Sequence, residues 1–335
     1  MVTVSVLMCV YNGEKDVKEA IDSILNQTFT DFEFIIVNDC STDNSAAIIN
    51  SYTDSRIKVL TNKTNLGLAA SLNVGLQAAQ GEYIVRMDSD DISLPNRLQK
   101  QVDFMDAYPN IGVCGSWIKV FGDANYYWRP KANAEYLRCK LLFNTPLPHP
   151  TWIIRHSIIK QHNLYYSQTM RRAQDYDYLV RMSNYAQLGC IQQVLLNYRY
   201  EFVTRKPENH NEALKNIFAV RKELLEKLGV YFTEEEHQLH HLLSESKFKS
   251  PELSPTKVGK WLTKLLQANA KSKVYNHTKL RILIGELWMQ TLMNNIAKAV
   301  PAKLSYPNLW LSLLMAVWSI SVNRIAMLSR PNSKR

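Results

Sequence analysis

Strand and helix patterns alternate over about the first 90 residues, and this alternation limits the folds that the chain can adopt. Apolar runs typical of buried strands alternate with segments that carry apolar residues at helical spacing. The expected strands are 2–10, 32–37, 57–60 and 83–87, and the expected helices are 14–25, 46–52 and 67–80. Gly81 is expected to close the last of these helices. Strands separated by helices of this length form βαβ units, so we predict an α/β fold with a mostly parallel central sheet.

Three of the expected strands end in polar residues. Tyr11 and Asn12 follow the first strand, Asp39 follows the second, and the acidic segment 88–91 follows the fourth. In open α/β sheets, ligands bind at the carboxyl ends of the strands. We therefore expect a ligand site at this edge of the sheet.

The segment 87–91 places three carboxylates within four residues, directly after an apolar run. Carboxylates are rarely buried unless a cation compensates them. Ligand sets made only of oxygen suit Mg²⁺ or Mn²⁺. The alternative is an acidic turn that opens a helix near Pro95, with Asp91 or Ser93 as its N-cap.

Two common nucleotide-binding motifs are missing from the chain. It contains neither GxGxxG nor GxxxxGK[ST], so a nucleotide would have to be held in another way. The five cysteines are scattered and form no CxxC pair, which favours reduced thiols in a cytosolic setting without a disulfide framework or zinc site. The apolar segment 4–10 lacks the features of a signal peptide.

Several segments resemble glycosyltransferase family 2, in order and in spacing. They are 4–12, 27–29, 32–43, 65–67, 81–84 and 87–91. The resemblance covers residues 1 to about 205 and implies a GT-A catalytic domain, with a donor half at about 1–125 and an acceptor half at about 126–205. It implies inverting transfer of a hexosyl or N-acetylhexosaminyl group from a nucleotide-sugar. The chain lacks the QxxRW motif of processive synthases, which favours a single sugar added per encounter.

The resemblance also assigns residues to the donor. Asp39 would pair with the nucleotide base, although on sequence alone it could instead cap the helix that follows. Asp88 and Asp90 would handle the ribose and a Mn²⁺ or Mg²⁺ ion, with Asp90 as the direct metal ligand. The complete set of expected donor-binding residues is Tyr11, Glu14, Asp39, Asn65, Asp88 and Asp90.

A further acid is needed because the acceptor hydroxyl must lose its proton as it attacks the anomeric carbon. The family's base lies within a Glu-Asp pair, and the matching position here is Gln174-Asp175. We therefore expect Asp175 to be the base. Asp177 competes for a place on the acceptor side, and both acids could instead serve the dipole of a helix that starts there.

Two other residues come from the same resemblance. His149 matches a His-Pro element near the acceptor, but a loop histidine without a role is the alternative. Glu201 is near the place of a histidine that sometimes binds the metal in this family. Whether Glu201 contacts a metal is left open.

Positive charge is concentrated in the last third of the chain. Residues 1–201 carry nearly equal numbers of basic and acidic residues, whereas residues 202–335 carry about twice as many basic as acidic ones. The pattern from about 206 onward is helical, so we expect a basic helical extension over 206–335. Such an extension suggests an anionic partner. Its Trp and Leu content and lack of Arg clusters favour a membrane surface over nucleic acid.

Three features of the extension have two interpretations each. The segment 257–273 reads as a basic amphipathic helix that either lies on a bilayer or packs on the protein. His237, His240 and His241 fit a zinc site or a helix with a solvated acidic start. The uncharged run 309–322 is shorter than the ~20 residues of a membrane span, so we expect an in-plane helix, with a core or dimer helix as the alternative.

These observations lead to one hypothesis. The chain is expected to be a metal-dependent, inverting glycosyltransferase that uses a UDP-linked sugar. Its acceptor is expected to be a lipid-linked glycan, a lipopolysaccharide or a capsule precursor, and its location the cytoplasmic face of the inner membrane. The alternatives are the same chemistry on a protein or soluble acceptor, or a non-catalytic nucleotide-sugar binding module, for which Gln174 is the hint.

Overall fold

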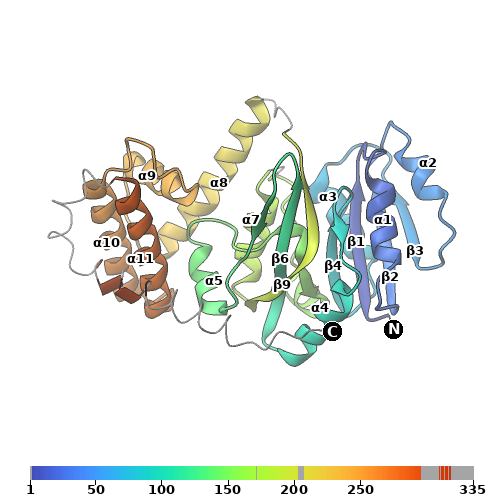
Figure 1. Cartoon of the computed structure of the whole chain (residues 1–335), viewed down its shortest axis with the longest axis horizontal. Coiled ribbons are helices and arrows are strands. Elements are labelled where there is room, and N and C mark those ends of the chain that lie inside the picture. The colour runs from blue at the N-terminus through green and yellow to red at the C-terminus, as the bar shows by residue number, and fades with distance from the viewer. Residues whose placement is uncertain are drawn as a thin grey trace. The chain divides into compact units, whose positions relative to one another are not determined.

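The computed structural model describes residues 2–170, 172–202 and 207–295, and beyond these only 309, 311, 312, 314, 315 and 317. The chain folds into two units (Figure 1). Unit 1 consists of Met1–Leu137 and Thr145–Ile217, and unit 2 consists of Arg138–Asn144 and Phe218–Arg335.

Four parallel strands form one half of the sheet in unit 1. Their spatial order is β3 (Ile57–Thr61), β2 (Phe32–Asn38), β1 (Val4–Val10) and β4 (Tyr83–Asp88). The connecting helices are α1 (Val17–Leu25), α2 (Ser45–Asn50) and α3 (Leu68–Ala78). The α/β fold with a mostly parallel sheet is therefore confirmed, and the first strands and helices lie where their periodicity predicts them.

The other half of the sheet is mixed. β8 (Ile153–Arg155) is antiparallel to both β4 and β6 (Ile111–Gly122), whereas β9 (Gln187–Tyr200) runs parallel to β6. The short strands β5 (Ile92–Ser93) and β7 (Tyr126–Trp128) pair with β9 and β6, respectively. The remaining helices of unit 1 are α4 (Arg97–Ala107), η1 (His149–Thr151), α6 (His156–His162) and α7 (Gln174–Met182).

Alternation along β1 and β4 separates a fully hydrophobic face from a mixed one that carries charged residues. Val6 and Met8 lie opposite Val85 and Met87, and all four are fully buried in the main core. Burying a side chain of this kind contributes about 1.5–3 kcal/mol. Cys9 lies opposite Asp88, and Leu7 lies opposite Arg86. Because side chains alternate between the faces of a strand, these residues share the other face of the sheet.

Gly81 has a different role from the one predicted. Helix α3 ends at Ala78, and the residue after it, Ala79, is already extended. Gly81 instead lies against β1, where a Cβ atom would be 2.5 Å from the backbone nitrogen of Ser5. The glycine permits this close approach of the two segments, and the prediction that it caps the helix is wrong.

Unit 2 is helical over its described part, as predicted. It contains α9 (Glu234–Ser244), α10 (Pro255–Ser272) and α11 (His277–Asn294), while α5 (Ala134–Lys140) and α8 (Pro207–Lys227) run from one unit into the other. The apolar face of α10 packs against α9 and α11. Its residues Val258, Trp261, Leu262, Leu265 and Leu266 are all buried. The packed-helix interpretation therefore holds for α10, and its apolar face is not available to a bilayer.

The three histidines of α9 form part of the packing of unit 2. The Nε2 atom of His240 lies 2.8 Å from the carbonyl oxygen of Leu142, and Nδ1 of His241 lies 2.6 Å from Nη1 of Arg221. The one carboxylate, histidine or cysteine cluster with metal-binding spacing in the described residues is elsewhere, in unit 1. The zinc interpretation of these histidines is therefore wrong for this part of the chain.

Most of the uncharged run 309–322 lies outside the described residues, so its predicted in-plane position stays a prediction. Among the helices that the structure describes, none combines the length and the apolar character that a membrane span requires.

Candidate active site

Three carboxylates meet where β4 ends. Oxygen atoms of Asp88, Asp90 and Asp91 all lie within 4.8 Å of one another. Asp91 is fully buried, and its Oδ1 accepts a hydrogen bond of 2.8 Å from the backbone amide of Arg199. Its Oδ2 has no hydrogen-bond partner among the described residues. An unsatisfied buried oxygen beside two further carboxylates fits a divalent cation, which prefers oxygen ligands.

The alternative function of this turn is wrong. Helix α4 begins at Arg97 and its N-cap is Asn96, so neither Asp91 nor Ser93 caps it. The family resemblance assigns the metal to Asp88 and Asp90, and the structure adds Asp91 as a third carboxylate. The signal was present, because Asp91 directly precedes the strand residues Ile92 and Ser93, which hold it against β9.

Burial and neighbouring negative charge raise the pKa values of Asp90 and Asp91. Burial, followed by the charges of Asp88 and Asp90, raises the pKa of Asp91 well above its ordinary value. Asp90 is exposed at the rim, yet restricted hydration and the charge of Asp88 raise its pKa to about 6. Arg86 forms an ion pair with Asp88 and opposes this effect. Close like charges of this kind are relieved by a proton or by a cation.

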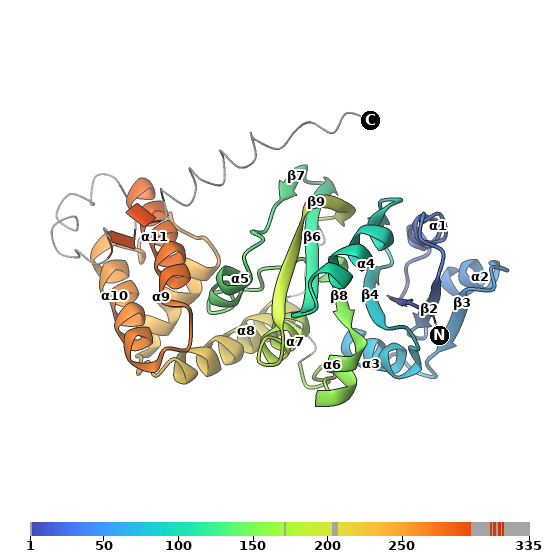
Figure 2. The same ribbon diagram turned by 90° about the horizontal axis from the view of Figure 1, so that it is seen from below.

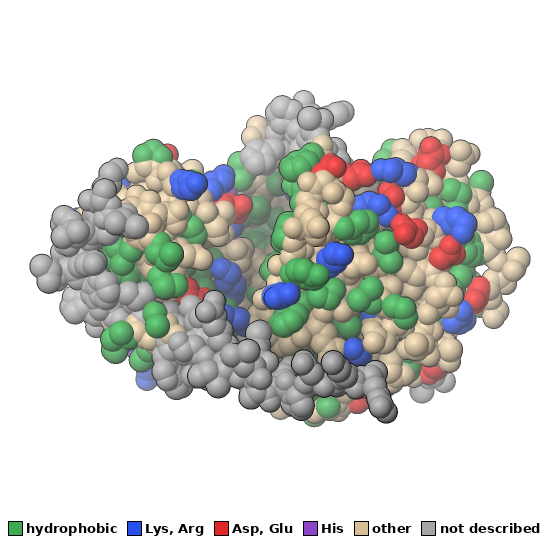
Figure 3. Space-filling model, viewed as in Figure 1, with side chains coloured by type: hydrophobic (Ala, Val, Ile, Leu, Met, Phe, Trp, Pro, Cys, Tyr) green, Lys and Arg blue, Asp and Glu red, His purple; other side chains and the backbone are tan. Residues whose placement is uncertain are grey.

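Arg199 fastens the acidic turn to helix α1. Its Nε donates to the carbonyl oxygen of Asp90 at 2.9 Å and lies 3.2 Å from a carboxylate oxygen of Asp16. Its Nη2 donates to Glu19 at 2.7 Å. Glu201, two residues further on, pairs with Lys15 at 2.5 Å. Acidic and basic side chains gather over α1 and the upper edge of unit 1 in the view of Figure 3.

Asp39 is buried at the end of the neighbouring strand β2. Its Oδ1 accepts hydrogen bonds from the Asn62 side chain and the Leu66 amide, and its Oδ2 accepts one from the Gly67 amide, each at 2.8 Å. Asp39 thus holds the loop before α3, and it does not cap α2, whose N-cap is Asn44. A carboxylate has about four acceptor positions, so about one remains for a ligand.

The other expected donor residues lie around the ends of β1 and β2. Tyr11 is 53 % exposed directly after β1. Glu14 accepts a hydrogen bond of 2.8 Å from the Asn44 amide, and the Asn65 side chain donates to the carbonyl oxygen of Asp39 at 3.4 Å. Because β1 pairs with both β2 and β4, these residues and the acidic turn occupy one edge of the sheet.

Asp175 lies in the first turn of α7 and is partly buried. Burial raises its pKa, Arg86 lowers it, and Asp88 raises it. The carboxylate therefore responds to the charges of the acidic turn. Asp177 has another partner, since its Oδ2 accepts two hydrogen bonds from Arg181, at 2.8 and 3.0 Å.

The backbone before Asp175 adopts an unusual conformation. Ala173 has φ 60° and ψ 20°, in the left-handed region that residues other than glycine rarely occupy. Asn12 after β1 and Cys40 after β2 also have positive φ values, of 49° and 59°. Strained backbone of this kind is often found at functional sites. No periodicity or motif in the sequence predicts it.

His149 is buried in the turn η1. Its Nε2 lies 2.8 Å from the hydroxyl of Tyr166, and its ring packs edge-on against Trp152 with centroids 4.6 Å apart. Burial and the charge of Arg86 hold the pKa of His149 well below its ordinary value. The imidazole is therefore neutral at physiological pH, and it responds to the same arginine as Asp175.

Comparison with known proteins identifies the family. The model of "Glycosyl transferase family 2" matches residues 5–173, which is half of the chain and includes the ends of β1, β2 and β4. The chain belongs to this family. It is therefore a glycosyltransferase that uses a nucleotide-sugar donor.

Relatives of this glycosyltransferase support the assignment. An uncharacterized glycosyltransferase of Haemophilus influenzae is 32 % identical over 234 residues, which cover 64 % of this chain and 71 % of that protein. The Escherichia coli protein WfgD, a UDP-Glc:alpha-D-GlcNAc-diphosphoundecaprenol beta-1,3-glucosyltransferase, is 39 % identical over 102 residues, or 30 % of this chain and 40 % of WfgD. The structure of Staphylococcus aureus TarS 1–349 with UDP-GlcNAc has a TM-score of 0.57, 21 % identity and coverage of 87 % and 89 %, and confirms the GT-A fold.

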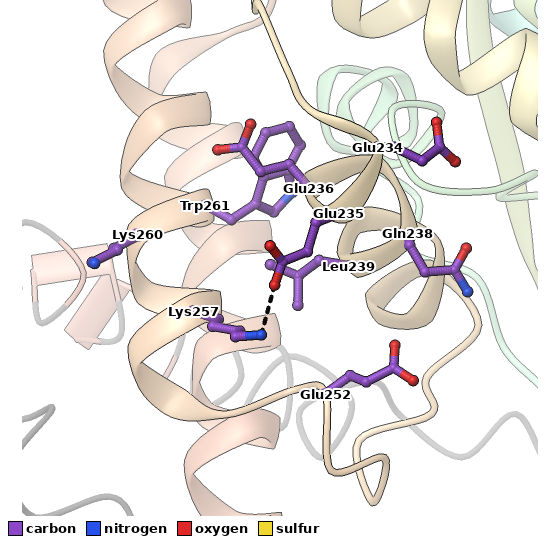
Figure 4. Close-up of a pocket in the computed structure, with 9 residues that line it drawn as sticks. All are labelled: Glu234, Glu235, Glu236, Gln238, Leu239, Glu252, Lys257, Lys260 and Trp261. Atoms are coloured by element: carbon purple, nitrogen blue, oxygen red, sulfur yellow. Dashed lines mark hydrogen bonds and ion pairs between the residues drawn. The ribbon is translucent and has the colours of Figure 1, made fainter.

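The glycosyltransferase has another pocket, in unit 2, that does not involve these residues (Figure 4). It has a volume of roughly 710 Å³ between α9 and α10, with Leu239 and Trp261 in its wall. Lys257 forms an ion pair of 2.6 Å with Glu235 across it. None of the described residues that line it is one of the expected donor, metal or acceptor residues, so we assign it no part in the transfer.

Proposed function

We propose that the chain is a metal-dependent, inverting glycosyltransferase that moves one sugar from a UDP-linked donor to a hydroxyl of a lipid-linked glycan. The observation that carries this proposal is the group of three carboxylates at the end of β4, beside the ends of β1 and β2. A diphosphate is a poor leaving group unless its developing negative charge is neutralised. Carboxylates are themselves negative, so they can contribute to this neutralisation only by holding a cation.

Asp90 and Asp91 would hold a Mn²⁺ or Mg²⁺ ion, with Asp88 as a further oxygen donor at the same point. When bound, the ion would neutralise the negative charge that develops on the departing diphosphate. Arg86 forms an ion pair with Asp88 and so supplies a positive charge directly beside the acidic turn. Asp39, Tyr11, Glu14 and Asn65 would hold the nucleoside end of the donor along the same edge.

Asp175 would act as the base. Its carboxylate takes the proton of the acceptor hydroxyl while the hydroxyl oxygen forms a bond to the anomeric carbon. The bond between that carbon and the diphosphate oxygen breaks, its electron pair leaves with the diphosphate, and attack from the opposite face inverts the configuration. The raised pKa of Asp175 suits this role, because a base works best when its pKa is near the working pH.

The acceptor class is supported by relatives and by chemistry. The name of WfgD describes transfer from UDP-Glc to a sugar on diphosphoundecaprenol, a lipid carrier. A water-soluble donor and a lipid-bound acceptor meet at a membrane surface, so we place the enzyme peripherally on the cytoplasmic face of the inner membrane. Lipopolysaccharide and capsule precursors belong to the same acceptor class.

The experiment that tests the proposal measures hydrolysis and transfer with a panel of UDP-sugars, with Mn²⁺ and with EDTA. Activity that depends on a divalent ion and on one UDP-sugar is expected. Asp90→Ala should weaken Mn²⁺-dependent donor binding about tenfold or more. The matched control is Asp103→Ala, which removes an exposed carboxylate of helix α4 that is not part of the acidic turn. Full activity in EDTA would refute the metal-dependent mechanism.

A further inference from the structure

The short strand β7 carries three neighbouring aromatic side chains that are open to solvent. Tyr126, Tyr127 and Trp128 are 53 %, 50 % and 36 % exposed. β7 pairs with β6 and with no other described strand, so it has one edge without a strand partner, and it lies beside the long strands β6 and β9 (Figure 2). Exposed edge strands are usually protected by charges or by proline, so a row of aromatic residues there indicates an interaction surface.

The aromatic side chains occupy both faces of the strand. Tyr126 lies opposite Val120 and Trp128 lies opposite Ile118, whereas Tyr127 lies opposite Lys119. Since successive side chains of a strand point to opposite faces, Tyr127 projects away from the other two. A single stacked sugar ring could use only one of these faces. A layer of lipid headgroups around the strand can contact the side chains on both faces.

The charges around β7 are mainly positive. The segment 117–131 contains one acid, Asp123, and three basic residues, Lys119, Arg129 and Lys131. The carboxylate of Asp123 accepts a hydrogen bond of 2.7 Å from the backbone amide of Phe202. The guanidinium of Arg129 lies over the rings of Tyr127 and Trp117, at 4.7 and 5.3 Å from their centroids. The stacking keeps a positive charge beside the exposed aromatic residues.

We propose that this basic aromatic edge, formed by Lys119 and residues 126–129, docks the enzyme on an anionic bilayer surface. Tyrosine and tryptophan are favoured at the level of the lipid headgroups, where their rings are buried and their polar atoms stay hydrated. Arginine and lysine there interact with lipid phosphates. The unpaired backbone of β7 stays at headgroup depth, where water and headgroups satisfy its polar groups.

The docking surface is continuous with the acidic turn. Tyr126 pairs with Val120 on β6, Val120 pairs with Tyr198 on β9, and the next residue, Arg199, donates its amide to Asp91. Two strand spacings amount to about 10 Å. A headgroup held at the bilayer surface would thus lie within reach of the proposed metal site. The inference rests on the proposed lipid-linked acceptor and names the surface that brings the enzyme to it.

The test is sedimentation of the full chain with vesicles of phosphatidylglycerol and phosphatidylethanolamine, compared with neutral phosphatidylcholine vesicles. Replacing Tyr126, Tyr127 and Trp128 together by serine should weaken binding to the anionic vesicles about tenfold or more. Arg129→Gln should weaken it about fivefold, with little effect on neutral vesicles. Tyr108→Ser is the matched control, because Tyr108 is also 53 % exposed in unit 1 and should be dispensable for binding.

Other outcomes would overturn the inference. The parent chain could fail to bind vesicles, or the serine variant could bind as well as the parent. If vesicle binding is unchanged but the KM for a soluble glycan acceptor rises, the aromatic edge is a glycan platform instead. Unchanged thermal unfolding of the variants shows that they are folded. Donor hydrolysis measured without vesicles tests the proposed function separately, so each idea can fail alone.

Discussion

Arg86 and Asp88 form an ion pair on one face of β4, and only 4 % of the Arg86 side chain is exposed. Burial alone would lower the pKa of Arg86, but the charge and hydrogen bonding of Asp88 more than compensate and raise it. The pair is the electrostatic centre of the site. The charge of Arg86 also acts on Asp90, Asp175 and His149.

The first prediction concerns this pair. Replacing Arg86 by methionine leaves Asp88 without its counter-ion, and breaking a buried pair in this way should lower the free energy of unfolding by about 3 kcal/mol. Urea denaturation measures the change. The double variant Arg86→Met with Asp88→Asn should recover part of the loss, because the uncompensated charge is gone. Additive effects of the two substitutions would show that the side chains do not interact in solution.

The second prediction separates the two acids of α7. Asp175→Asn should lower kcat by about 10²- to 10⁴-fold with little change in the dissociation constant of the donor, because only proton removal is lost. Asp177→Asn should lose its pair with Arg181 and at most about 0.5 kcal/mol of stability, as is typical of such helical pairs. Rapid-quench transfer assays and calorimetric donor titration provide the two measurements. Equal losses of kcat in the two variants would contradict the choice of Asp175.

The third prediction concerns the pH dependence of stability. Burial and Arg221 lower the pKa of His241 to about 4, whereas the residue has an ordinary value in the unfolded chain. The unfolded state therefore binds a proton on His241 more readily than the folded state does. As the pH falls from about 6.5 toward 4, the free energy of unfolding should decrease by up to ~3 kcal/mol. Urea denaturation at pH 7 and pH 5 measures this loss. His241→Gln keeps an acceptor for Arg221 and should flatten the dependence; an equally steep curve would exclude His241 as its source.

The fourth prediction concerns Ala173, with φ 60°. The left-handed conformation costs a residue with a Cβ about 1–2 kcal/mol, and glycine avoids this cost. Glycine also loses more conformational entropy on folding than alanine, which offsets part of the stabilisation. Ala173→Gly should therefore stabilise the protein by about 0.5–1 kcal/mol. Thermal unfolding measures the change, with Ala134→Gly in the helical conformation of α5 as a control that should be destabilising. A destabilised Ala173→Gly protein would contradict the strained conformation.

Short-range patterns predicted the first half of the sheet well, because the apolar runs of β1, β2 and β4 are uninterrupted and bounded by turns. They did not predict β9, although it has 14 residues. Gln192 and Gln193 interrupt its alternation, and its pairing with β6 contains register shifts. Such a strand is specified by its neighbours more than by its own sequence.

The candidate site shows the same limit. The acids were visible in the sequence because they cluster, but the role of Arg86 was not, since a lone arginine in a strand carries no pattern. The sequence leaves a cap open as the alternative for Asp91, because its hydrogen-bond partner Arg199 is 108 positions away. The amphipathic pattern of α10 is equally consistent with an apolar face buried in lipid and with one buried against protein. The structure shows that the apolar face of α10 is buried within the protein.

Residues 138–144 belong to unit 2, although residues 145–217, which follow them, belong to unit 1. The two units are therefore not separate stretches of the chain. Leu141, Leu142 and Phe143 are buried, and the carbonyl oxygens of the last two bind His240 and Arg221. A protein cut after residue 205 would keep this seven-residue segment but lose the helices α9–α11 of unit 2, to which the segment belongs. The helical half is therefore not an appendage that can be exchanged between enzymes, and any chimera must transplant the short internal segment together with the tail.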